Sequence, residues 1–237
     1  MLHILLIYDL LVCLSLVWGG YSATPKRKDG LHPIMFMQCG EIAHEEKHQV
    51  KKIHELVPIK TKFEALQEDF ALILNELVED YDRNNLIISE IEKFKNRNIL
   101  ILSDRIEHLN ILYHLLKAIN IESVLLYGGM PVKVQKEALK KSQTANAILS
   151  TSSYIGEGVD FSHLDTIVLT MPISFSGRIV QYLGRIGRRG QKCLAIDFVD
   201  ENTPMFRSSF TKRMKGYRQM GYKEVKSSDK MNLFLYN

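Results

Sequence analysis

Five short apolar runs alternate with segments of helical periodicity from about residue 98 onward, and this alternation constrains the fold more than any other feature of the chain. Each run is apolar at almost every position, as a strand must be when helices cover both faces of a parallel sheet. The segments between them, 105–119, 132–142 and 176–189, are each long enough for a helix. The runs are "NILILS", "SVLLYGG", "NAILST", "TIVLTM" and "CLAIDFV". The sequence therefore predicts a doubly wound α/β domain with a parallel sheet.

Helices are also expected before and after this domain in the sequence. Residues 60–96 repeat apolar side chains at helical spacing, from Phe63 through Phe70 to Leu77. A basic helix is expected from about 201 to 222, after Pro204. This tail helix carries many lysines and arginines within 207–226, which form either a solvated helix face or a nucleic-acid contact, and the sequence favours neither.

The first twenty residues, "MLHILLIYDLLVCLSLVWGG", are apolar enough to suggest a signal peptide or a membrane anchor. No basic residue precedes the apolar stretch, Asp9 lies within it, and no small residue stands where a cleavage site needs one. We therefore interpret the stretch as one or two buried strands. The three cysteines are odd in number and widely separated, which excludes a disulfide scaffold and fits a reducing interior. We expect a cytoplasmic protein without stable membrane association.

Ligands of open parallel sheets bind at the carboxyl ends of the strands, so the residues that follow each run carry the functional signal. "AILST" is followed by "SSYIGEGVDF", and the helical segment after "TIVLTMP" ends in "QYLGRIGRRG". Glycines allow close backbone approach and arginine forks bind phosphate oxygens in pairs, so both segments suit a phosphate-rich ligand. A helix through the second segment would place Gln181, Arg185 and Arg188 on one face. With a formal net charge of only +4, any affinity for a polyanion has to come from such local clusters.

In this order, the segments resemble the motifs of superfamily 2 helicases of the DEAD/DEAH type. "QYLGRIGRRG" is similar to the QxxGRxGR motif, and "STSSYIGEGVDF" resembles the xTxxxxxEGxDx motif. "NILILSDRIEHLNIL" resembles the strand and helix that open the second RecA-like domain, and "LLYGGM" resembles its nucleic-acid-facing turn. Upstream, "YSATPKRKDG" resembles the SATPxRxDG motif that ends the first RecA-like domain in DNA-directed members. Five such segments in the family's order, over roughly residues 20–200, form a specific pattern.

The resemblance implies a role for each matching residue. Arg185 and Arg188 would reach the terminal phosphates of the nucleotide as arginine fingers, and Gln181 would lie at the nucleotide and couple its cleft to the bound strand. The other matching residues line the nucleotide (Gly158 and Asp160), contact the nucleic acid (Gly128, Ser150 and Thr151) or couple hydrolysis to strand movement (Ser22 and Thr24).

Two motifs of the family are missing from the sequence. No G-x-x-x-x-G-K-[ST] loop occurs, and no DEAD- or DEAH-like carboxylate box precedes Ser22. The resemblance implies that ATP and Mg²⁺ are shared with a first RecA-like domain that is either missing or carried by a separate chain, so no ATPase activity is expected from this chain alone. The alternatives are a non-catalytic nucleic-acid-binding module and a decayed helicase fragment. DNA is preferred to RNA as the ligand because of "SATPKRKDG".

The H-E-x-x-H pattern of zinc peptidases also occurs, at His44, Glu45 and His48, with Glu64 or Glu68 as a third ligand. The surrounding stretch is charged almost all round and lacks the apolar face that a metallopeptidase helix needs. We therefore interpret it as a solvated connector and expect no metal site.

The expected organisation has four parts: a remnant of the first RecA-like domain at 1–30, a connector and helical segment at 31–95, a helicase C-terminal RecA-like domain at 96–200, and a basic helix and tail at 201–237.

Overall fold

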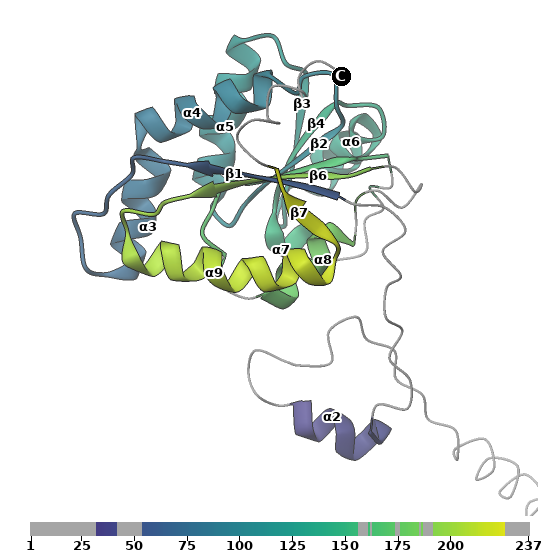
Figure 1. Cartoon of the computed structure of the whole chain (residues 1–237). Helices are drawn as coiled ribbons and strands as arrows, with labels where there is room; N and C mark the ends of the chain where they lie inside the picture. Colours follow the sequence, from purple (N-terminus) through teal and green to yellow (C-terminus); the bar gives the residue numbers. More distant parts are fainter. Residues whose placement is uncertain are drawn as a thin grey trace, which may run out of the picture. The chain divides into compact units, whose positions relative to one another are not determined.

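The computed structural model describes residues 32–41, 54–155, 161, 163–173, 176–184, 186 and 192–225. The chain divides into two compact units, Met1–His48 and Gln49–Asn237. Within the first unit, the described residues contain the helix α2 (His32–Cys39). The second unit holds the sheet and the other described helices (Figure 1).

A seven-stranded sheet forms the centre of the second unit, with strand order β3-β4-β2-β5-β6-β1-β7. Every pair of neighbouring strands is parallel. The strands are β1 (His54–Lys60), β2 (Ile99–Ser103), β3 (Ser123–Leu126), β4 (Ala147–Thr151), β5 (Thr166–Leu169), β6 (Leu194–Val199) and β7 (Tyr222–Glu224). All five predicted apolar runs form strands, so the predicted doubly wound parallel sheet is confirmed.

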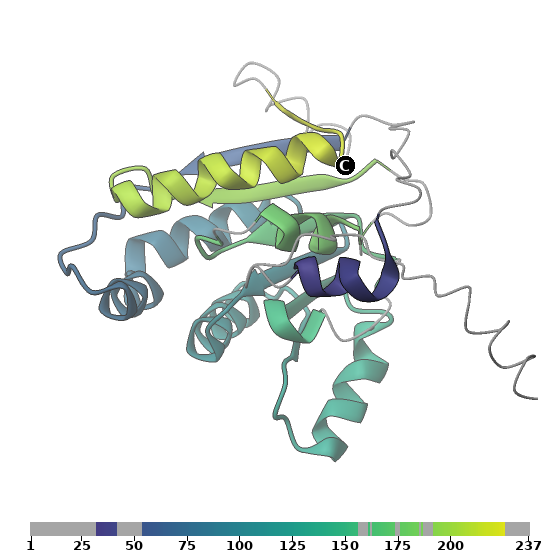
Figure 2. The same cartoon turned by 90° about the horizontal axis from the view of Figure 1, so that it is seen from below.

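Helices cover both faces of the sheet, as runs that are apolar at every position require. α4 (Tyr81–Glu92) and α5 (Ile106–Ala118) pack on one face, where Ile87, Ile91 and Leu112 are fully buried. The other face is covered by α6 (Val132–Ser142), α7 (Ser152–Ile155), α8 (Ser176–Leu183) and α9 (Pro204–Gln219). Figures 1 and 2 show these two layers with the sheet between them.

α3 (Phe70–Glu79) begins ten residues later than the sequence predicted. The Asp69 side chain caps it by accepting hydrogen bonds from the backbone N–H groups of Ala71 (2.9 Å) and Leu72 (3.2 Å). The prediction of helix from residue 60 is therefore wrong in its first part. Residues 61–68 instead lie beyond the end of β1, where Phe63 stacks on Phe206 of α9 with ring centroids 6.2 Å apart.

β1 was predicted as part of a solvated connector, yet it lies between β6 and β7. The backbone of Glu55 donates to Cys193 on the β6 side, whereas Leu56 accepts from Val225 on the β7 side. Alternate residues of a strand direct their backbone polar groups to the same side. Pro58 lies two residues after Leu56, so its nitrogen, which has no hydrogen, faces away from β6. The described pairing with β7 ends at Leu56. A proline is tolerated here because the strand needs no donor at that position.

No helix among the described residues is both long and apolar enough to span a bilayer.

Candidate functional site

The carboxyl edge of the sheet gathers polar side chains from most of its strands. β2 ends at Ser103 and β4 at Thr151, and both side chains are buried. Thr61, Thr170 and Asp200 directly follow β1, β5 and β6, and they are also buried. Such residues at the ends of parallel strands make this edge the place where the fold can hold a ligand.

Three predicted nucleic-acid contacts come together at one corner of this edge. β3 and β4 pair so that Leu126 lies opposite Ser150, and Gly128 follows Leu126 by two residues. Gly128 is exposed in the turn after β3, and a Cβ atom placed there would meet nothing within 4 Å. Ser150 and Thr151 are buried at the end of β4, and the Ser153 hydroxyl donates to Thr151 Oγ1 (3.4 Å).

Gln181 is exposed on α8, but the predicted single helical face is not supported. α8 ends at Leu183, and Gly184, a poor helix former, follows it as a turn. Gly184 and Ile186 are not helical, so the prediction of one helix to residue 189 is wrong at its carboxyl end. The predicted residues that lie outside the described part of the chain are Ser22, Thr24, Gly158, Asp160, Arg185 and Arg188.

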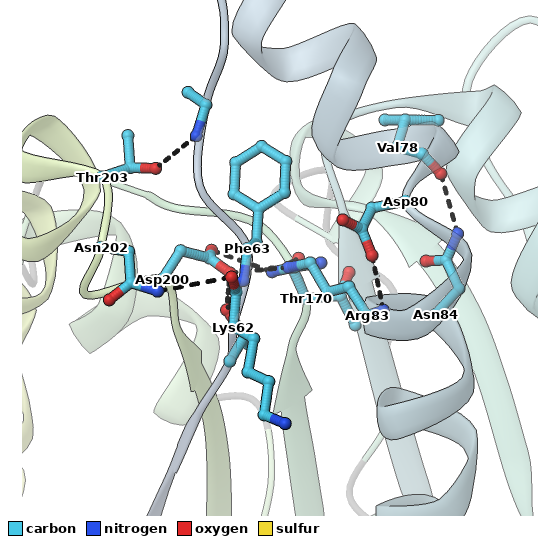
Figure 3. A network of polar contacts seen from close by, with 12 residues as sticks. Lys62, Phe63, Val78, Asp80, Arg83, Asn84, Thr170, Asp200, Asn202 and Thr203 are labelled. Atoms are coloured by element: carbon cyan, nitrogen blue, oxygen red, sulfur yellow. Dashed lines mark hydrogen bonds and ion pairs between the residues drawn. The ribbon is translucent and has the colours of Figure 1, made fainter.

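A buried arginine–aspartate pair ties α4 to the end of β6 (Figure 3). Arg83 Nε donates to Asp200 Oδ1 (2.8 Å) and Arg83 Nη2 to Asp200 Oδ2 (3.1 Å). The Thr61 hydroxyl donates to the same carboxylate at 2.6 Å. Arg83 Nη2 also donates to the backbone carbonyl of Thr170 at 2.8 Å. α4 is therefore held to the segments that follow β1, β5 and β6.

A second buried pair ties α9 to the middle of β6. Arg213 Nε and Nη2 each donate to an oxygen of Asp197 at 2.8 Å, and the Tyr217 hydroxyl donates to Asp197 Oδ2 at 2.9 Å. Burial lowers the pKa of the Arg213 guanidinium, but the charge and hydrogen bonding of Asp197, together with Tyr217 and Asp200, outweigh burial and raise that pKa. Arg213 Nη1 donates to the carbonyl of Ile173 at 2.9 Å.

The two arginines hold the same segment of backbone from opposite faces of the sheet. Thr170 and Ile173 both lie in the connection from β5 to α8, the helix that carries Gln181. Sequence reasoning missed this arrangement and treated the basic residues of α9 as surface charges. The signal was present in "AIDFVD", because an acid within a buried strand requires a cationic or hydrogen-bonding partner.

His108 of α5 is buried beside the first pair. Asn84 donates to the carbonyl of Val78 (2.9 Å), so the Asn84 oxygen faces His108 Nε2 at 2.9 Å and that nitrogen carries the proton. His108 Nδ1 lies 3.2 Å from the Ser103 hydroxyl. Burial, followed by the charge of Arg83, lowers the pKa of His108 to about 3.

This low pKa makes stability depend on pH. Between the ordinary value of 6.5 and about 3, the unfolded chain binds a proton that the folded chain excludes, so acidification favours unfolding. The His108 contribution to the free energy of unfolding should fall by about 2 kcal/mol between pH 7 and pH 5. In urea denaturation, the free energy of unfolding of His108→Gln should fall by about 2 kcal/mol less than that of the unmodified chain between pH 7 and pH 5. His114→Gln is the control, since His114 is exposed on the same helix; an equal pH dependence in both variants would contradict the assignment.

The H-E-x-x-H residues His44, Glu45 and His48 lie outside the described part of the chain. Glu64 and Glu68 are exposed beyond β1. Over the ranges that the structure describes, no three His, Cys, Asp or Glu side chains gather in a way that could hold a metal ion.

Comparison with known proteins identifies a domain and a fold. The model of the helicase conserved C-terminal domain matches residues 82–190. "Putative helicase 161L" of Invertebrate iridescent virus 6 is 26% identical over 218 residues, covering 84% of this chain and 49% of that protein. "Putative ATP-dependent RNA helicase L396" of Acanthamoeba polyphaga mimivirus is 27% identical over 225 residues, covering 86% and 42%. The chain thus spans about half the length of these relatives.

The same fold occurs in a solved helicase structure. S. cerevisiae Dbp5 bound to RNA and ADP BeF3 superposes with a TM-score of 0.62 over 90% of this chain and 52% of that chain. The sequence identity of 16% limits this comparison to the fold. The parallel sheet, the order of its strands and the matching family model lead to one conclusion: residues 82–190 match a helicase conserved C-terminal domain, and the sheet has the fold of the second RecA-like half.

Proposed function

We propose that this chain is the second half of an ATP-dependent helicase or translocase and acts together with a first RecA-like domain. The observation that carries the proposal is the corner formed by β3 and β4. There the turn at Gly128 after β3 lies beside Ser150 and Thr151 at the end of β4, within a domain that matches the family model. A nucleic acid lying across that corner would contact an exposed turn and the ends of two strands.

In this proposal, Arg185 and Arg188 neutralise charge that builds on the terminal phosphate during hydrolysis, while Gly158 and Asp160 line the nucleotide. Charge neutralisation and positioning are the main protein contributions to phosphoryl transfer. Gln181 couples the nucleotide to the bound strand, and Ser22 and Thr24 couple hydrolysis to movement. The first domain supplies the phosphate-binding loop and the ligands of Mg²⁺.

The described residues beside the proposed nucleotide segment fit a ligand rich in oxygen atoms. Ser152 follows β4 directly, and its buried hydroxyl finds no hydrogen-bond partner within the part of the chain that the structure describes. This hydroxyl and the neighbouring Thr151 and Ser153 can donate to phosphate or sugar oxygens. When bound, ATP supplies the phosphoanhydride bond whose cleavage drives strand movement.

Two features favour different nucleic acids. "SATPKRKDG" resembles the motif of DNA-directed helicases, whereas L396 is named an RNA helicase and the Dbp5 structure contains RNA. Binding of oligodeoxythymidylate and oligouridylate of equal length to the purified chain distinguishes them. The DNA preference predicts the smaller dissociation constant for oligodeoxythymidylate.

Gly128→Asp tests the proposed corner. The open space around Gly128 admits the side chain without a clash, and the new carboxylate would face the phosphate backbone. Two unit charges about 4 Å apart in water interact by about 1 kcal/mol, so affinity for either oligonucleotide should fall roughly fivefold. Fluorescence anisotropy with a labelled oligonucleotide measures the change.

Asn146→Asp is the matched control for this prediction. Asn146 is exposed and directly precedes β4, so the same charge is added at the opposite edge of the sheet. Affinity should stay at the value of the unmodified chain. Equal losses in the two variants, or no loss in either, would exclude the corner as a binding site.

A further inference from the structure

The helix α9 carries basic residues without any acidic residue to balance them. Its sequence, PMFRSSFTKRMKGYRQ, contains five cationic side chains and no Asp or Glu. One of the five, Arg213, is buried in the ion pair with Asp197. The other four are exposed: Arg207, Lys212, Lys215 and Arg218. α9 lies outside the matched family domain, which ends at residue 190.

The inner face of α9 fixes the helix firmly on the sheet. Arg213 and Tyr217 both bind Asp197 of β6, and Phe206 is 1% exposed beneath the first turn. Pro204 begins the helix, where its missing N–H costs nothing. The exposed cations therefore project from a rigid support, so little ordering of the backbone would be needed to bind a ligand.

Three of the exposed cations share one side of the helix. At 100° per residue, Arg207, Lys215 and Arg218 fall within roughly 80° of one another around the axis. Along the axis, Arg207 and Arg218 are about 16 Å apart. Within the part of the chain that the structure describes, none of the three forms an ion pair. No direct ion pair among the described residues neutralises these charges, so all three cations can contact the phosphates of an extended polyanion.

The neighbouring exposed residues indicate which polyanion fits. Ser208 and Gln219 lie among the cations, and their hydroxyl and amide groups can donate to phosphate oxygens. The Thr211 hydroxyl instead donates to the carbonyl of Arg207 at 3.3 Å.

An anionic membrane surface would instead require exposed apolar side chains to insert beside the cations. Of the large apolar side chains of α9, Phe206 and Tyr217 are buried and Met214 packs against the core. Phe210 is half-buried, with its ring centroid 5.6 Å from the guanidinium carbon of Arg213. Among the large apolar side chains of α9, Met205 at the start of the helix is the one that is exposed.

We infer that this face of α9 is a second binding surface for the phosphate backbone of a single-stranded nucleic acid, with no preference for sequence. The inference rests on the proposed function in its choice of ligand. α9 begins at the carboxyl edge, just after β6, and runs along the sheet (Figures 1 and 2). β4, β2 and β5 lie between β3 and β6, so the start of α9 is about 14 Å to the side of the end of β4 and about 19 Å to the side of the turn at Gly128. A strand leaving that corner can continue along α9.

The test removes two of the charges from the full chain. Lys215→Gln/Arg218→Gln should bind an oligonucleotide of about 25 residues roughly tenfold more weakly at low salt. The slope of log affinity against log salt concentration should decrease by about 1.4. Lys95→Gln/Lys117→Gln is the matched control, because it removes two exposed cations from the opposite layer of helices and should leave both values unchanged. Lys215→Arg/Arg218→Lys keeps the charges and should keep the affinity. Far-UV circular dichroism of each variant verifies that the fold is retained.

The outcomes separate this inference from the proposed function. If Gly128→Asp weakens binding and Lys215→Gln/Arg218→Gln does not, the α9 surface is excluded and the proposed function stands. If neither change weakens binding, both are excluded. If the α9 variant instead loses only its binding to phosphatidylserine vesicles, the surface recognises membranes and the inference is overturned. An equal loss in the matched control would show a general charge effect and would also overturn it.

Discussion

Arg213→Met is expected to lower the free energy of unfolding by roughly 3–5 kcal/mol. The side chains of Arg213 and Asp197 are 1% and 0% exposed, so the substitution leaves a carboxylate buried without its cation. The Tyr217 hydroxyl would remain as a donor to Asp197 among the described side chains. One hydrogen bond from the neutral Tyr217 hydroxyl cannot replace the two hydrogen bonds that the charged Arg213 guanidinium donates to Asp197. Since a domain of this kind is stable by only about 5–15 kcal/mol, the loss should be large in urea denaturation followed by circular dichroism.

Two further variants identify the cause of that loss. Lys212→Met removes the adjacent cation of α9, which is exposed, and should change stability by no more than about 0.5 kcal/mol. Arg213→Met/Asp197→Asn removes both charges while keeping an acceptor for Tyr217, and it should recover much of the lost stability. A double variant no more stable than Arg213→Met would show that lost packing, and not the unpaired carboxylate, is responsible.

Arg188→Ala is expected to reduce ATP hydrolysis about a thousandfold or more when the chain acts with a first RecA-like domain. In the proposed function, this change removes one of the two arginines that neutralise the terminal phosphate in the transition state, so the turnover number should fall far more than nucleotide affinity. The measurement is steady-state ATPase of the two domains together, stimulated by an oligonucleotide. The unmodified chain alone should show no such activity.

The neighbouring arginine provides the control for that experiment. Arg189→Ala removes the same charge one position beyond the QxxGRxGR pattern, and it should retain most of the turnover. Arg188→Lys keeps the charge but not the planar fork, and it should recover little of the activity. Unchanged turnover in Arg188→Ala would remove this residue from the proposed mechanism.

The central strands could be predicted because each has an unambiguous pattern. "NILILS" and "CLAIDFV" are apolar at almost every position and are flanked by polar segments, so strand formation and burial coincide, and both form strands of the sheet. β1 could not be found in this way. "HELVPIK" mixes two charged residues and a proline with three apolar ones, and it becomes a strand because β6 and β7 supply partners that are distant in sequence.

Residues of the candidate site could be predicted only where they lie next to a strand that is recognisable in the sequence. Gly128 and Thr151 follow recognisable strands, so their meeting at one edge follows from the parallel topology. The pair of Arg83 and Asp200 joins residues 117 positions apart, and nothing local distinguishes Arg83 from a surface arginine of an amphipathic helix. The boundary of α8 was misjudged because helical spacing was extended through Gly184, where the helix has already ended.

The insertion of β1 between β6 and β7 determines when this domain can fold on the ribosome. The bond from the Thr61 hydroxyl to Asp200 joins residues 139 positions apart, so translation at about 5–20 residues per second separates their emergence by roughly ten to thirty seconds. Throughout that interval Leu56, Val57 and Ile59 have left the exit tunnel without the strand that will bury them. A nascent chain arrested before Leu194 should therefore bind chaperones through this segment, and release from them should coincide with synthesis of β6.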